Sequence, residues 1–223
     1  MSQLVQSLRS FFFSPVKEIQ RKLQYIGGWE GCREPRRLFN AIASPRDPRK
    51  CRLRVAGGAR RLMHLMPEGP YRAAVEVAEK FADEVIGIEE LRDAWRQTEP
   101  IHPGPGSDVL WLARHTVRPE AEKAVRKGIN CAMRSGEKLA RADLVRDLFG
   151  KQFHPEVQLG PWLSDDVMGV ARMIYDQNRF DHMPILADAL EESGCDSETV
   201  LDHCRGGHHA RGCWVVDQIL GKT

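Results

Sequence analysis

Apolar residues recur at steps of three and four along most of the chain, and this spacing restricts the fold more than any other feature. The clearest stretch begins at Tyr71, with its buried positions predicted at Val75, Ala78, Ala82 and Val85. Similar patterns cover residues 88–95, 120–133, 142–149, 167–175, 185–190 and 214–220. Sustained alternation of apolar and polar residues, which would mark strands, is nearly absent. The sequence therefore predicts an all-α fold, an irregular bundle of many helices.

Proline and glycine suggest a division of this bundle into two lobes. Residues 98–108, TEPIHPGPGSD, contain three prolines and two glycines, a composition that favours neither helix nor strand. We expect a Pro/Gly-rich loop there, between a helical lobe at 29–97 and a second at 109–223, with residues 1–28 as an N-terminal helical extension. Helix starts are predicted at Ser14-Pro15 and at Ser164, where a capping side chain precedes proline or acidic residues.

Charge is balanced over the chain but uneven along it. The formal net charge of +2 gives no global field that would require a nucleic acid or an anionic membrane as partner. Residues 1–80 carry 16 Lys and Arg against 7 Asp and Glu, whereas residues 81–223 carry 17 against 24. The lobe at 29–97 is thus predicted to be basic and the lobe at 109–223 acidic.

The six cysteines are predicted to be free thiols in a reducing cytoplasm. The N-terminal stretch MSQLVQSLRSFFFSPVKEIQ lacks the apolar run and small-residue cleavage site of a secretory leader. No stretch approaches the roughly 18 apolar residues that a membrane-spanning helix needs, so no membrane span is expected.

The strongest local charge bias lies in residues 33–61, which contain ten Lys and Arg against two acidic residues. Such clustering is typical of phosphate contacts, which makes a nucleic-acid-binding accessory protein one candidate function. No recognised nucleic-acid-binding motif accompanies the segment, and internal pairing with the acidic half is the alternative. The candidate phosphate-binding residues are Arg36, Arg37, Arg49, Lys50, Arg52, Arg54, Arg60 and Arg61.

Several phrases of the sequence are similar to one known family. They are WEGC (29–32), RRLMHLM (60–66), RAAVEVAEKFAD (72–83), LVRDLFGKQFHP (144–155), IYDQNRFDHMPILADALEESGC (174–195) and HCRGGHHARGCWVVDQILGK (203–222). Together they resemble an uncharacterised family of small bacterial all-helical proteins that occurs as many paralogues. The resemblance implies a helical fold and no particular activity. This chain departs from the family at Gly58 and Ala59, where the family often has two adjacent cysteines.

Three cysteines and three histidines cluster in SGCDSETVLDHCRGGHHARGCW (193–214). One hypothesis is a zinc site, for which the candidate ligands are Cys195, Cys204, His209 and Cys213. His209 and Cys213 are four residues apart and would share a helical face, whereas His203 and Cys204 would diverge by about 100°. Against zinc, the segment lacks the close Cys-x2-Cys pair of common structural sites. Cys204 and Cys213 also fit the apolar stripes of helices, where free cysteine packs as a small hydrophobe, so the pattern favours buried thiols. A reactive cysteine is the remaining alternative.

The sequence contains no Gly-rich phosphate loop, nucleophile elbow or closely spaced metal carboxylates, so it favours a non-catalytic protein without a cofactor. The function predicted first is a helical interaction module, an adaptor or a subunit of a larger assembly with a protein partner. Its predicted docking residues are Phe11, Phe12 and Phe13, which would form an exposed apolar patch. Nucleic-acid binding and a zinc-stabilised module are the two alternatives.

Overall fold

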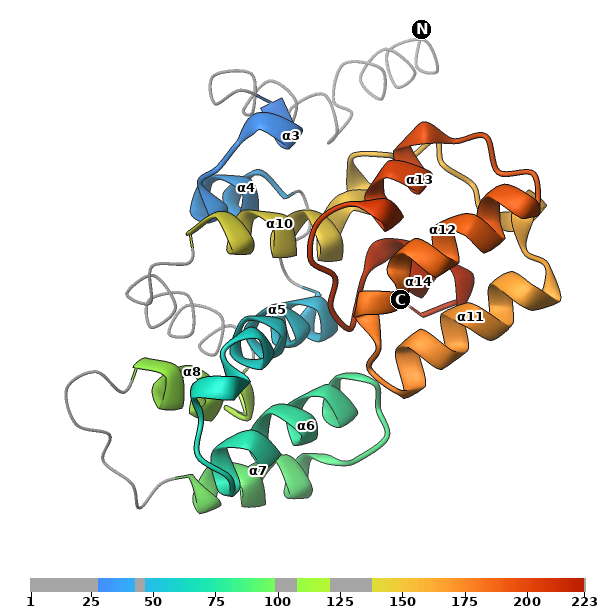
Figure 1. Cartoon of the computed structure of the whole chain (residues 1–223). Helices are drawn as coiled ribbons and strands as arrows, with labels where there is room; N and C mark the ends of the chain where they lie inside the picture. Colours follow the sequence, from blue (N-terminus) through green and yellow to red (C-terminus); the bar gives the residue numbers. More distant parts are fainter. Residues whose placement is uncertain (1–27, 43–46, 99–107, 121–137, 223) are drawn as a thin grey trace, which may run out of the picture.

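The computed structural model is all-helical over residues 28–42, 47–98, 108–120 and 138–222, the part of the chain that it describes (Figure 1). Its α-helices are α3 (Gly28–Gly31), α4 (Pro35–Ala41), α5 (Pro48–Arg61), α6 (Pro70–Ala82), α7 (Ile88–Gln97), α8 (Asp108–Thr116), α10 (Lys138–Phe149), α11 (Asp165–Asp176), α12 (Met183–Glu192), α13 (Glu198–Arg205) and α14 (Trp214–Ile219). Short 3₁₀ turns lie at Met63–Leu65, Gly150–Gln152, Gly160–Trp162 and Phe180–His182. No strand occurs in these residues, so the predicted all-α fold is confirmed.

Local capping chemistry explains where two of the longer helices begin. The Asp47 side chain accepts a hydrogen bond from the backbone N–H of Lys50, and Pro48 occupies the first turn of α5. At α11 the predicted Ser164 cap is confirmed, because its side chain accepts from the N–H of Val167. The predicted start at Ser14-Pro15 lies outside the described residues.

Helix α6 confirms the predicted apolar stripe over most of its length. Val75, Ala78 and Ala82 are buried, but Val85 is 70% exposed, so the prediction for Val85 was wrong. The helix ends at Ala82, and Glu84 then adopts a positive φ of 58°. The chain has left the helical path before Val85, and the helical period no longer determines which way that side chain points.

Three clusters of buried residues form the core, and α5 takes part in two of them. One cluster packs α5 against α6, α7 and α8; the second packs α4 and the Leu53 side of α5 against α10; the third lies among α11, α12, α13 and α14. Figure 1 accordingly shows α5 between α10 above it and α6 below it. Helix α5 is therefore the central element of the described fold.

Helix α8 belongs to the same core cluster as the helices that precede residues 98–108. Leu112, Ala113 and Val117 are buried against α5 and α6. The buried guanidinium of Arg52 on α5 donates to the carbonyls of Thr116 and Arg118 at the end of α8. The predicted lobe boundary at 98–108 thus falls within one core cluster, because apolar residues on both sides of it pack together.

A buried ionic network joins the helices of the first and third clusters. Arg49 on α5 donates to Asp83 at 3.1 Å and to Asp217 on α14 at 2.6 Å, while its side chain is only 13% exposed. Lys50 also pairs with Asp217. The Tyr175 hydroxyl of α11 donates to Asp83 at 2.6 Å, and Arg49 donates to that hydroxyl. The expected pairing of basic residues in 33–61 with acids of the C-terminal half is confirmed here.

None of the helices in the described residues combines the length and the apolar content needed to cross a membrane.

Candidate metal centre

The centre is built around Asp147, a carboxylate in the last turn of α10. Ala142, Val145 and Leu148 of this helix are buried in the core, and the Asp147 side chain is itself only 2% exposed. One carboxylate oxygen, Oδ2, accepts a hydrogen bond of 2.9 Å from the backbone N–H of Ala210. That bond fixes the orientation of the carboxylate and leaves Oδ1 directed at the side chains of the α13–α14 segment.

Two histidines meet this oxygen. His209, in the loop between α13 and α14, places Nδ1 2.7 Å from Asp147 Oδ1. His203, in the last turn of α13, places Nε2 3.3 Å from the same oxygen. The ring of Trp214 lies 5.1 Å from the His203 ring, centroid to centroid, and packs against it.

Cys213 supplies a thiol to the same point. Its Sγ lies 3.3 Å from His203 Nε2 and 3.9 Å from His209 Nδ1. Gly212 precedes it with φ +95°, and a Cβ at Gly212 would lie 2.7 Å from Leu148 and 2.8 Å from Leu53. Both the positive φ and the close packing require glycine at this turn, which aims Cys213 inward at the start of α14.

The four donor atoms together have the arrangement of a small metal site. The ligand atoms of Asp147, His203, His209 and Cys213 all lie within 4.8 Å of one another. In tetrahedral zinc, bonds of about 2.0 to 2.3 Å separate neighbouring ligand atoms by roughly 3.3 to 3.6 Å. Two of the separations above equal 3.3 Å, while the Asp147–His209 separation of 2.7 Å is shorter and the Cys213–His209 separation of 3.9 Å is longer than that range.

Burial and charge together set the protonation of the group. Burial alone would raise the pKa of Asp147, but the nearby His209 and His203 outweigh it and hold that pKa below its usual value. Burial would lower the pKa of His209, but the Asp147 carboxylate outweighs it and raises the value. Burial raises the pKa of the Cys213 thiol well above its usual value, and the charge of Asp147 adds to the effect. A thiol in this setting needs a cation beside it in order to ionise.

Two of the four predicted zinc ligands, His209 and Cys213, belong to this group. Cys195 and Cys204 do not, because both face the apolar core of α11–α14, where they are 4% and 0% exposed. For those two residues the structure matches the alternative of buried thiols. Cys32 and Cys51 are likewise buried.

Two members of the group, Asp147 and His203, were absent from the predicted ligand set. The sequence predicted that the adjacent residues His203 and Cys204 would not bind the same ion, and this is correct. Of the two, however, it is His203 and not Cys204 that faces the site. Asp147 precedes His203 by 56 residues in the sequence. The sequence feature that could have identified it is a carboxylate on the otherwise apolar face of a helix. The His209 side chain is only 6% exposed, whereas its neighbour His208 is exposed.

Most of the candidate phosphate-binding residues are engaged inside the protein. Arg49 and Lys50 pair with the buried acids described above, and Arg52 donates to backbone carbonyls. Arg54 lies 4.1 Å above the Phe39 ring, and Arg60 forms a two-pronged pair with the buried Glu79.

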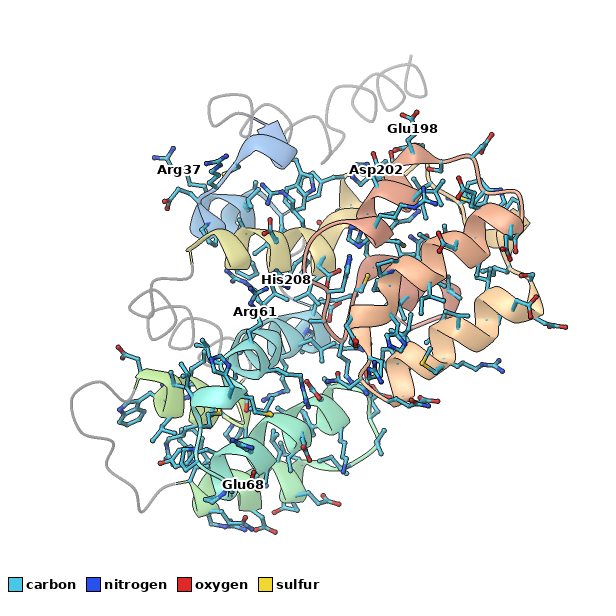
Figure 2. All side chains as sticks on the ribbon, in the orientation of Figure 1. Arg37, Arg61, Glu68, Glu198, Asp202 and His208 are labelled. Atoms are coloured by element: carbon cyan, nitrogen blue, oxygen red, sulfur yellow. The ribbon has the colours of Figure 1, made fainter. Side chains whose placement is uncertain are left out.

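The remaining candidates are placed as follows. Arg37 is exposed on α4, and Arg61 lines a pocket together with His208, beside which it lies in Figure 2. The side chain of Arg36 and the predicted docking residues Phe11, Phe12 and Phe13 lie outside the description.

Comparison with known proteins returned no match: no family model, no curated protein and no solved structure is similar to the chain.

Proposed function

We propose that this protein is a non-catalytic helical module completed by a structural zinc ion. The observation that carries the proposal is the convergence of one carboxylate, two imidazoles and one thiol on a single buried point, all within 4.8 Å. We infer that the module acts through contact with a protein partner, because a closed structural ion supports a fold and leaves no open position for a substrate.

Zinc fits this donor set better than the other common metals. Imidazole and thiolate together favour zinc, whereas calcium and magnesium take sets made mainly of oxygen. Four protein ligands fill the tetrahedron that zinc prefers in structural sites, while catalytic sites have three and keep a position for water. The N–H of Ala210 on Asp147 Oδ2 is the kind of supporting hydrogen bond that orients a ligating carboxylate.

The ion would join segments that are far apart in sequence. Asp147 belongs to α10 in the cluster around α4, whereas Cys213 begins α14 in the cluster of α11–α14. A ligand that binds only the folded state stabilises it by mass action, by about 2.7 kcal/mol when its free concentration is 100 times its Kd. The expected role is therefore to hold the α13–α14 segment against α10.

The test is metal content and metal-dependent stability of the full chain. We expect one zinc ion per chain by elemental analysis and native mass spectrometry, and a lower melting temperature after removal by a chelator. Cobalt in place of zinc should give a thiolate charge-transfer band that is absent in Cys213→Ser.

Adjacent histidines provide a matched pair of variants. His209→Gln should lose the ion, whereas His208→Gln, one residue away and exposed, should keep it. The proposal is wrong if the chain as purified and after incubation with zinc holds no stoichiometric metal, or if both variants bind it equally.

A further inference from the structure

The donor group is buried on one side and bordered by a pocket on the other. The pocket has a volume of about 180 Å³. Its wall includes Asp147, His203 and His209, three of the four donors, whereas Cys213 is not part of it. An ion at the centre would thus have the thiol behind it and a solvent-connected space in front of it.

Two glycines of the loop between α13 and α14 line this pocket. Gly206 and Gly207 form part of it, and Gly207 has φ +76°, a conformation that other residues adopt at a cost. A Cβ on Gly206 would lie 3.0 Å from the Asp202 carbonyl, so this loop is closely folded against the end of α13.

Three acidic residues, three histidines and one arginine line the pocket. Asp202 is exposed on α13 and is labelled in Figure 2, and Asp143 on α10 also lines the pocket. The single basic residue in the wall apart from the histidines, Arg146, is paired with Asp143 at 3.0 Å and also donates to the carbonyls of Trp29 and Cys32. Asp202 therefore leaves a negative charge at the opening that would attract a divalent cation.

Resting on the proposed function, we propose that the metal site exchanges its ion with solution through this pocket while the protein stays folded, with Asp202 as the residue that attracts the incoming cation. The structural ion is then reversible, and occupancy follows the free concentration of zinc. An ion enclosed on all sides would instead be trapped until the chain unfolded.

The experiment measures zinc release and uptake by the full chain with a coloured zinc chelator in rapid mixing. Release is compared with the unfolding rate extrapolated to the same buffer without denaturant. We expect release faster than unfolding. In Asp202→Asn, uptake at low ionic strength should slow about threefold, as one unit charge near a divalent ion would produce, and the difference should shrink at high salt.

Asp176→Asn is the matched control, because this exposed acid on α11 lies outside the pocket wall. It should leave both rates unchanged. Stoichiometric zinc that leaves only at the unfolding rate would overturn the exchange route but not the zinc site. Uptake that is equally fast in Asp202→Asn and wild type would overturn the role of Asp202. Absence of bound zinc would overturn the proposed function itself.

Discussion

Arg49 is the residue whose removal should damage the fold most clearly outside the metal centre. Its guanidinium contacts Asp83, Asp217 and Tyr175, groups that come from three different parts of the chain. The side chains of Asp83 and Asp217 are only 2% and 3% exposed, so their charges are balanced mainly by protein partners. Arg49→Ala therefore leaves negative charge in the interior with weaker compensation.

The loss of stability in Arg49→Ala depends on the partners that Asp83 and Asp217 keep. Removal of one partner of a buried ion pair costs about 3 to 5 kcal/mol. Here Asp83 keeps the hydrogen bond from Arg211 at 2.7 Å, and Asp217 keeps Lys50, so we expect the lower end, about 3 kcal/mol. For a chain of this size, that loss lowers the melting temperature by roughly 6 to 12 °C.

The assay is urea unfolding followed by far-ultraviolet circular dichroism, with zinc concentration held equal in all samples. Arg92→Ala is the control: its pair with Glu89 is at the surface, with side chains 50% and 68% exposed, and its loss should cost less than about 0.5 kcal/mol. A loss below about 1 kcal/mol for Arg49→Ala, or equal losses in the two variants, would refute the view that the network holds α5 to α14.

Two further predictions concern neighbouring parts of the fold. Gly150→Ala should destabilise the protein by about 1 to 3 kcal/mol and change the near-ultraviolet spectrum, because its Cβ would lie 2.6 Å from the Trp214 ring; unchanged stability and spectrum would contradict this. For Asp83, burial raises the pKa, but hydrogen bonds from Tyr175 and Arg211 outweigh it and lower the value. The resulting stability is present above the ordinary carboxyl pKa of about 4 and is lost as pH falls through the lower folded value, so unfolding midpoints from pH 6 to pH 2 should fall less steeply in Asp83→Asn.

The helical elements could be predicted from the sequence because their causes are local. The apolar period of α6 and the capping side chain at Ser164 act within a few residues of chain, and the structure confirms both. The error at Val85 also has a local cause, a turn at Glu84 that interrupts the period. The packing of α8 against α5 depends on contacts between segments that are distant in sequence. The apolar period of a single helix carries no information about such contacts.

The candidate site was only half predictable for the same reason. His209 and Cys213 stand close in sequence, although they meet through the turn at Gly212 and not along a helical face as expected. Asp147 reaches the group only through the packing of α10 against the α13–α14 segment. A carboxylate on the buried face of an apolar helix, in LVRDLF, is the sequence signal that points to such a residue.

Charge balance allows two states of this group, one with a protonated imidazole beside Asp147 and one with the proposed cation. A buried carboxylate is costly unless it is compensated, and a protonated imidazole balances only that one charge while the Cys213 thiol stays neutral. A divalent ion balances both the Asp147 carboxylate and an ionised Cys213, and it does so with the histidines neutral, the form in which imidazole binds metal. The four residue types would thus give the proposed zinc ion a net charge of zero in a buried place.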